Sequence, residues 1–557
     1  MQHYHFNILN RRSFLSTAAK AGMAAAFASL IDIPLVMKRA LAEGTIGLNG
    51  KKLLFIWLRG ANDGLNSVIP VLDSGYYAFR PTGGNNIGIP MDGGTNYSTT
   101  GGCDFPTAGA NSTYGFYPNA IRTGNGFCAL HPSLKFLAPV YNAGDLALIH
   151  RVGYPRQSRS HFDSQNYWEN GNPNNNLVKS GIFYRAMYES GLANTAPLTG
   201  VSIQSALPLI LRGDEAAMTN LTDPTRYALA GIPNDTNGVA KAFMHLSSAN
   251  TAQFAPKKNR DLLALQYGNL SNTLSIFNSI IGFDEAENLF QDNIKTDGDT
   301  TWSPIDANGN PIPGSDSSKG YFLFPTTNDK NGGWRRSADP NGVNGNKYVV
   351  DPTHQSFFRN LKAAALVLNK TDAIIAGTEL GGFDTHSAQG GLTGAHPNLN
   401  RAIGWAIYGL YKYFTLYADR ATWNNTIVVT LSEFGRTSRQ NSDLGTDHAE
   451  ASVMWVAGGA VKGYNAGNPS GVFNCHTGDG IPWVTGNTGS MFQVSGSYLR
   501  RNTDFRSVLG EIIREHLGAT QNQLNRIIPG YANAAEGLLN GPTSIDGTPI
   551  RGEVGIL

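Results

Sequence analysis

Short continuous apolar runs recur along the chain, each followed by a polar loop. Residues 51–58 read KKLLFIWL, and similar runs occupy 145–152, 372–377, 426–431 and 452–457. A run of this length without alternation is typical of a strand that is buried on both faces, as in a parallel sheet. The pattern therefore predicts five central strands.

Between these runs lie longer stretches with helical spacing of apolar residues. They cover 132–143, 160–170, 355–369, 398–419 and 505–517, and the last reads FRSVLGEIIREHL. Strands that alternate with helices predict a doubly wound, mostly parallel α/β sheet with helices on both faces.

Two segments read as long insertions into one α/β domain that spans 43–557. Residues 74–127 are rich in Gly, Asn and Thr, and residues 295–350 are rich in Asp, Asn, Gly and Pro. We interpret both as surface loops, the second as a candidate lid. Within it, residues 306–310 resemble the start of a calcium loop, but the Gly and Glu expected later in that motif are absent, which favours a turn.

The first 42 residues have the pattern of an export signal. Arg11 and Arg12 precede a weakly apolar stretch at 18–36, and residues 40–42 (ALA) offer a signal peptidase site. This arrangement is typical of the twin-arginine route, which carries folded proteins across the membrane. We expect the translocase as a partner, cleavage after Ala42 and a periplasmic or extracellular protein; a retained membrane anchor is the alternative. No later segment approaches a transmembrane run, so the mature protein should not span the membrane.

Composition excludes one class of partner and constrains the cysteines. The net charge is +2 with 15% charged residues, which argues against a nucleic-acid binder. The three cysteines are Cys103, Cys128 and Cys475. An oxidising compartment permits one disulfide, and Cys103–Cys128 is the nearest pair along the chain. A metal site built from these cysteines is not expected, because no CxxC spacing exists.

Polar side chains gather in the loops that follow the predicted strands. Asp63, Asp384 and Glu433 each come shortly after an apolar run, and Asp447-His448 precede the last one. The loop after the second run carries Ser158, Ser160 and His161. In a doubly wound sheet such loops meet at one edge, where ligands bind.

This set has the chemistry of a divalent metal site. Asp384 and His386 follow a Gly-Gly turn, and His448 offers a further imidazole, with Asp447 beside it. Zinc and manganese accept carboxylate and imidazole ligands, and calcium accepts carboxylates. With Asp63 and Glu433 the residues would complete one or two sites, and two metals close together can clamp the oxygens of a phosphoryl or sulfuryl transfer.

Ser160 is our candidate nucleophile, with Ser158 as the second choice. Ser160 opens a predicted helix, whose N-terminal N–H groups can bind an oxyanion. Arg159 or Arg436 would hold the non-transferred oxygens. Each residue also has a structural alternative. Ser160 can be a helix N-cap completed by Asp163.

Other polar residues of the set have structural alternatives too. Asp63 can stabilise a turn, Arg436 can pair with Glu433, and an isolated Asp-x-His is often structural. His131 and His150 read as core or capping groups, whereas His354 and His396 stay undecided.

Four ordered motifs resemble an exported bacterial family known as "domain of unknown function 1501". They are LFIWLRGANDGLNSVIP, ALHPSLKFLAPVYNAGDLALIHRVGYPRQSRSHFDSQNYWENG, ELGGFDTHSAQ and TIVVTLSEFGRTSRQNSDLGTDHAEASVMWVAGGAVKG. The resemblance runs from about residue 51 to residue 517. It implies the alkaline phosphatase-like superfamily of phosphatases and sulfatases, a doubly wound sheet and commonly two metal ions.

Mapped by motif, the resemblance implies Asp63 as the first ligand, Ser160 as nucleophile, Asp384 with His386, and His448 last. The chain also departs from that pattern. The expected Asp-x-x-x-His is Asp384-x-His386 here, and the expected Asp-His is Glu433-Phe434, which loses one imidazole. No Cys-x-Pro-x-Arg sulfatase signature is found, so a formylglycine nucleophile is not expected.

Two functions follow as hypotheses. The first is an exported metal-dependent hydrolase that acts on a small or polymeric phosphate or sulfate ester. The second is a non-catalytic envelope protein that uses the same scaffold to bind a glycan or a protein partner. Five tryptophans offer stacking surfaces for sugars, although most Trp residues are core residues: Trp57, Trp168, Trp302, Trp334 and Trp483.

Overall fold

The computed structural model describes twelve ranges of the chain. They are residues 39–40, 43–73, 75–91, 102–103, 119–192, 198–216, 218–222, 323–325, 350–464, 471–475, 498–533 and 535–557. Almost all of the predicted export signal, the calcium-like segment and most of 295–350 lie outside these ranges. No helix in the described ranges is long and apolar enough to cross a membrane.

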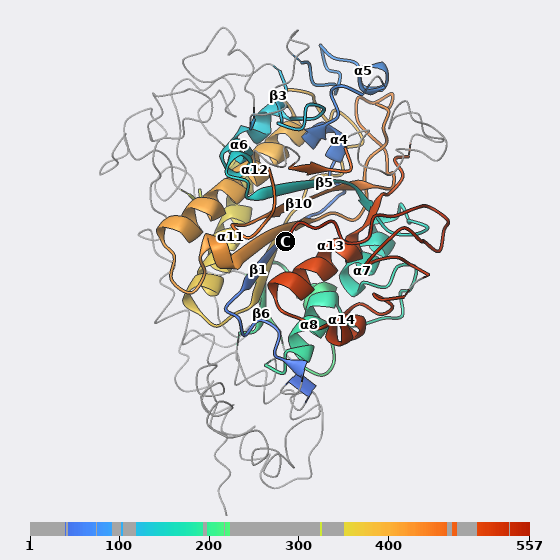
Figure 1. Ribbon diagram of the computed structural model, residues 1–557. Helices are drawn as coiled ribbons and strands as arrows, with labels where there is room; N and C mark the ends of the chain where they lie inside the picture. The colour runs from blue at the N-terminus through green and yellow to red at the C-terminus, as the bar shows by residue number, and fades with distance from the viewer. Residues whose placement is uncertain are drawn as a thin grey trace, which may run out of the picture.

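A large mixed sheet forms the centre of the molecule (Figure 1). Its strands run in the order β11-β5-β10-β9-β1-β8-β6-β7, and β12 pairs with β5. Pairing is parallel except at β10, which is antiparallel to both β5 and β9. The strands are β1 (Lys52–Leu58), β5 (Leu146–Gly153), β6 (Gly200–Ile203), β7 (Thr219–Leu221), β8 (Ile375–Leu380), β9 (Thr426–Leu431), β10 (Ser452–Ala457), β11 (Val472–Phe473) and β12 (Thr503–Asp504).

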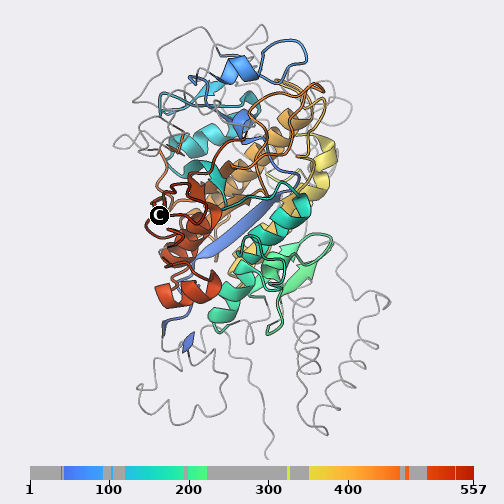
Figure 2. The ribbon, with the colours of Figure 1, turned by 90° about the vertical axis from the view of Figure 1, so that its right-hand side faces the viewer.

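Helices cover both faces of this sheet, because successive side chains of a strand point to opposite faces. Leu54, Ile56 and Leu58 of β1 join one apolar core, whereas Leu53, Phe55 and Trp57 join the other. The first core contains α6 (Ala138–Asn142), α11 (Gln355–Lys370) and α12 (Ala395–Leu416). The second contains α7 (His161–Asn170), α8 (Ile182–Glu189), α13 (Phe505–Glu511) and α14 (Gln521–Ile527). Figure 2 shows β1, in blue, between these helices.

A second sheet of three short strands lies apart from the first. It has the order β2-β4-β3, with β2 (Val68–Ile69), β3 (Ile121–Arg122) and β4 (Ala129–Leu130). The remaining helices are short: α4 (Gly64–Ser67), α5 (Tyr76–Phe79), η2 (Pro132–Leu137), η3 (Leu209–Leu211), η5 (Pro352–His354), η6 (Trp423–Asn425) and the π-helical η8 (Ile512–His516).

The five predicted strands are all present, and the mostly parallel α/β prediction is confirmed. Residues 426–431 and 452–457 form β9 and β10 as predicted, whereas the run at 372–377 forms β8 three residues later. The predicted helix at 132–143 is divided between η2 and α6. The prediction at 505–517 is divided between α13 and η8.

The first predicted insertion is not simply a surface loop. Tyr76, Arg80, Ile87 and Ile89 are all fully buried, so this part of 74–127 contributes to the core. The Gly- and Asn-rich composition predicted an exposed segment and did not indicate that Arg80 would be buried.

All three cysteines are free in the structure, so the predicted Cys103–Cys128 disulfide is not formed there. The Cys128 Sγ lies 2.8 Å from the Sγ of Cys475 instead, although the two residues are 347 positions apart in the chain. Nearness in sequence was therefore a poor guide to this contact.

Candidate metal centre

Three loops meet at one edge of the large sheet, and the one between β9 and β10 contributes residues from both of its ends. His161 is the first residue of α7 after β5, Asp384 and His386 follow β8, and Glu433 and Arg436 follow β9. These strands are parallel, so their carboxyl ends share an edge. The strand β10 runs the other way, and its preceding loop therefore brings His448 to the same edge.

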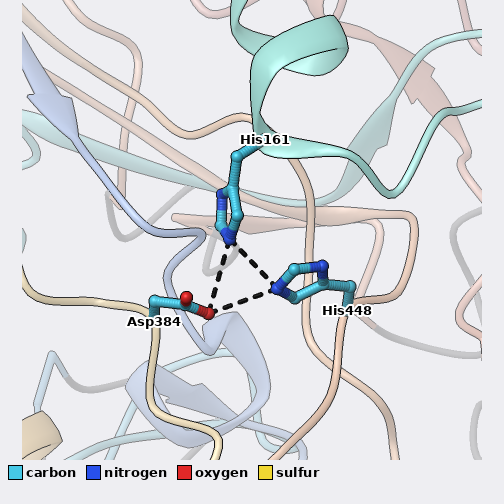
Figure 3. A group of neighbouring side chains, drawn as sticks. All are labelled: His161, Asp384 and His448. Carbon is cyan, nitrogen blue, oxygen red and sulfur yellow. Dashed lines mark hydrogen bonds and ion pairs between the residues drawn. The ribbon is translucent and has the colours of Figure 1, made fainter.

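Three of these residues form a triangle of donor atoms (Figure 3). The Nε2 of His161 lies 3.0 Å from the Nε2 of His448, and these atoms lie 3.4 and 3.2 Å from Oδ1 of Asp384. His386 adds a further imidazole, because its Nε2 lies 2.9 Å from that of His448 and 3.0 Å from the same Asp384 oxygen. Ligands that share a metal at about 2.1 Å lie roughly 3.0–3.4 Å apart, so these spacings fit a metal site.

The other nitrogen of each imidazole faces an oxygen acceptor. Nδ1 of His161 lies 2.8 Å from Oε1 of Glu433, and Nδ1 of His386 lies 3.1 Å from Oδ1 of Asp447. Nδ1 of His448 lies 2.8 Å from the backbone oxygen of Arg159. In the tautomer with the proton on Nδ1, each ring would donate to its acceptor and direct the Nε2 lone pair at the cluster.

The short separations between Nε2 atoms are compatible with a proton or a metal ion between them. Two lone pairs 2.9–3.0 Å apart repel each other unless a proton or a metal ion lies between them. The hydrogen bond that His161 donates to Glu433 raises the pKa of His161, whereas burial lowers the pKa of His448. A divalent cation satisfies all three imidazoles at once, and a single shared proton does not.

Arg436 fixes the negative charge of the cluster. Its buried guanidinium donates to Oδ1 of Asp384 at 2.5 Å. Burial alone would raise the pKa of Asp384, but the hydrogen bond and charge of Arg436 lower it to about 2. Asp384 is therefore an anion at neutral pH, which is the charge state in which a carboxylate can bind a metal.

Two glycines let the backbone segments of the centre approach each other. Gly60 has φ +105°, and a Cβ there would lie 2.5 Å from the backbone nitrogen of Asp384. A Cβ on Gly445 would lie 2.3 Å from the backbone carbonyl of His386. Any larger residue at either position would displace the Asp384–His386 segment.

Two predicted metal ligands lie one step outside the donor cluster. Glu433 is buried and accepts hydrogen bonds from His161, Gln165 and the backbone of Gly60. Burial would raise the pKa of Glu433, but the hydrogen bond from His161 lowers it. Asp447 orients His386 and is half-exposed. Both carboxylates contact an imidazole of the cluster and supply no donor atom to the triangle.

Asp63, a third predicted ligand, is occupied by other partners in the structure. It is fully buried, and its two oxygens accept from Arg80 at 2.7 and 3.0 Å. Gln389 donates to it at 2.7 Å. Burial would raise the pKa of Asp63, but the charge of Arg80 lowers it. The carboxylate therefore belongs to a buried ion pair, and its donor capacity is taken up there.

The predicted nucleophile occupies a helix N-cap. The Ser160 hydroxyl accepts from the backbone N–H of Asp163, and the Ser158 hydroxyl accepts from the backbone N–H of Ser160. Arg159 is exposed and stacks on Tyr498. Arg436 donates to four backbone oxygens as well as to Asp384, so it is committed to the protein: Gly60, Ala61, Phe383 and Thr446.

His161 belongs to the cluster, but our sequence analysis did not select it as a candidate ligand. The sequence analysis located His161 in the loop after β5 but selected the neighbouring Ser158 and Ser160 as candidate nucleophiles. The available signal was an imidazole at the first position of a helix that follows a central strand. Four other buried histidines have partners within the core: His131 caps η2, His150 donates to the backbone of Val68, His396 contacts Asn62, and His516 contacts the backbone oxygen of Lys52.

The donor set also narrows the choice of metal. Three imidazoles and one carboxylate suit zinc or manganese, whereas calcium prefers oxygen ligands only. Within the described ranges no second group of this kind accompanies the first. The sequence analysis expected one or two metals, and the described residues contain one such group.

Comparison with known proteins gives one match. No curated protein and no solved structure matches the chain significantly. The matched segment contains Asp384, His386, Glu433, Arg436, Asp447 and His448. Residues 344–468 match the model of a protein family of unknown function, DUF1501, and this match supports assignment of the chain to that family.

Proposed function

We propose that this protein is a metal-dependent hydrolase of phosphate or sulfate esters. The observation that carries the proposal is the convergence of three Nε2 atoms on one Asp384 oxygen, with every Nδ1 held by an acceptor. Imidazole and carboxylate are the ligands of catalytic zinc sites, and because four protein ligands complete a tetrahedron, water or substrate would enter as a fifth ligand.

The centre is open to solvent, as a catalytic site must be. The side chains of Asp384 and His386 are 47% and 44% exposed, and His161 and His448 are about one quarter exposed. A purely structural zinc site is normally closed by its ligands. This exposure supports access by a substrate.

Two features favour an anionic substrate. His161 begins α7, and the N-terminus of a helix carries partial positive charge and free N–H groups. Arg159 lies next to this position, is exposed, and is joined to the centre by the bond from His448 to its backbone oxygen. A phosphate or sulfate ester supplies the negative oxygens that such groups bind.

The residues divide into three roles. A bound zinc or manganese ion supplies Lewis-acid chemistry, which polarises the ester and acidifies water. His161, His386, His448 and Asp384 would hold the ion. Glu433 and Asp447 fix the tautomers and ring orientations of two ligands. Because the Ser160 hydroxyl is used as a cap, we assign the attack to a solvent water and not to this serine.

We also propose a superfamily and an export route for the protein. The ordered motifs and the sheet with its site at the carboxyl edge support a place in the alkaline phosphatase-like superfamily. The paired Arg11 and Arg12 and the site after Ala42 support folded export by the twin-arginine route. Export in the folded state suits a protein that acquires its metal before it crosses the membrane.

A turnover assay with matched variants tests this function. Zinc- and manganese-loaded protein is incubated with p-nitrophenyl phosphate, bis(p-nitrophenyl) phosphate and p-nitrophenyl sulfate. We expect turnover of at least one ester, its loss in His448→Ala, and its retention in Ser160→Ala, which should only weaken a helix cap by about 1 kcal/mol. Loss of turnover in Ser160→Ala, with metal still bound, would instead support the serine nucleophile. Metal binding without turnover of any ester would favour the non-catalytic binding function.

A further inference from the structure

The contact between Cys128 and Cys475 joins distant parts of the fold. Cys128 immediately precedes β4 of the small sheet, and Cys475 lies two residues after β11 at the edge of the large sheet. Both side chains are fully buried. Their sulfurs lie 2.8 Å apart, which is shorter than the roughly 3.5–4.0 Å that separates nonbonded carbon atoms in contact.

Both cysteines are held in place by their own backbone surroundings. The Asn125 side chain accepts from the backbone N–H of Cys128, and the Thr123 N–H donates to the Cys128 oxygen. On the other side, β11 pairs with β5, and the Asn474 side chain donates to the backbone oxygen of His150 and to Thr503. The two sulfurs therefore face each other in a preformed arrangement, and bond formation at about 2.05 Å needs a movement of less than about 1 Å.

We propose that Cys128 and Cys475 form a disulfide that fastens the edge of the large sheet to the small sheet. The bond forms by exchange with an oxidising disulfide, of protein or low molecular weight. The Cys128 thiolate attacks one sulfur of the oxidant and releases its first thiol. The Cys475 thiolate then attacks the mixed disulfide at the Cys128 sulfur and releases the second thiol. The two cysteines lose two protons and two electrons, and the oxidant becomes two thiols.

Cys103 is the competing partner. Burial raises the pKa of Tyr141, and Cys103 and Cys128 both add to this shift, so Cys103 lies near the pair as well. Cys103 is only partly buried, whereas the proposed pair is fully buried. A buried disulfide that closes a long loop removes freedom from the unfolded chain and resists reduction.

Peptide mapping of the full-length protein tests the assignment without any substitution. The protein is either exported by its own signal or refolded with oxidised glutathione, then alkylated, digested without reductant and analysed by mass spectrometry. We expect a linked peptide pair that contains Cys128 and Cys475, with Cys103 alkylated. A linked pair that contains Cys103, or alkylation of all three cysteines, would overturn the proposal.

Thermal unfolding with and without reductant provides a second test. We expect reduction to lower the midpoint by roughly 2–5 °C in the wild type and equally in Cys103→Ser. Cys128→Ser and Cys475→Ser should lose this difference, and their folding is checked by circular dichroism. A difference that disappears in Cys103→Ser would contradict the proposed pairing, even if a buried-serine variant fails to fold.

Discussion

The substitution Glu433→Gln tests whether metal binding depends on a residue that orients a proposed ligand but does not itself hold the metal. Glu433 is buried, and its Oε1 accepts from Nδ1 of His161 at 2.8 Å, so the carboxylate sets the tautomer of that ligand. Its Oε2 is buried without a hydrogen-bond partner. If a glutamine places its NH₂ group at the position of Oε2, it leaves a buried donor without an acceptor. If it places the NH₂ group at the position of Oε1, facing His161, the imidazole must accept at Nδ1 and carry its proton on Nε2.

Both arrangements weaken the site. Loss of a carboxylate that orients a histidine ligand typically reduces metal affinity by about 10–100-fold, equivalent to about 1.4–2.7 kcal/mol. The assay is competition for zinc with a chromophoric chelator at neutral pH. Asp447→Asn is the matched control, because Asp447 plays the same part for His386 but is 56% exposed, so water can replace it. We expect a clearly smaller loss of zinc affinity in Asp447→Asn than in Glu433→Gln. Equal zinc affinity in wild type and Glu433→Gln would refute the tautomer argument.

Three further predictions concern the support of the site and the fold. Gly60→Ala should weaken zinc binding, because its Cβ would lie 2.5 Å from the backbone nitrogen of Asp384. The control Gly381→Ala should bind zinc like wild type, because its Cβ would meet no atom within 4 Å. Equal losses of zinc affinity in the two variants would contradict this argument. Arg80→Met should lower the free energy of unfolding by about 3–5 kcal/mol in urea denaturation, because it leaves a buried carboxylate unpaired. By comparison, Arg420→Met should cost no more than about 1 kcal/mol, since its ion pair is exposed. Burial lowers the pKa of His516 to about 4, below its unfolded value of about 6.5, so stability is lost as pH falls from about 6.5 to 4. Between pH 6.5 and 5, the free energy of unfolding should therefore fall less steeply in His516→Gln than in wild type, by up to about 1.4 kcal/mol per pH unit. Equal slopes in the two proteins would argue against a neutral buried His516.

The central sheet was predictable because its strands are buried on both faces. The runs at 426–431 and 452–457 are bounded by polar residues on both sides, so both the type and the ends of β9 and β10 followed from the pattern. The strands β6 and β7 were missed, because GVSI and TNL are too short and too polar to give a periodic signal. The small sheet was missed for the same reason.

The candidate site was predictable as a neighbourhood but not as a list of ligands. Strand ends located Asp384, His386 and His448 at one edge, and the structure brings these residues together. That they bind a metal stays a prediction. Asp63 looked equivalent in sequence, but it faces Arg80, which lies in a segment read as a loop. The sequence reveals which groups are present at an edge, whereas the direction of each side chain depends on partners far along the chain.

Metal content is the measurement that tests the central claim most directly. The protein is purified without chelator or metal-affinity resin and analysed by elemental mass spectrometry, beside Asp384→Ala and the control Asp443→Ala, which alters an exposed carboxylate in the loop that precedes His448. We predict about one equivalent of zinc or manganese in the wild type and in Asp443→Ala, and its loss in Asp384→Ala. Wild-type protein without metal above background, or equal metal in wild type and Asp384→Ala, would contradict the account.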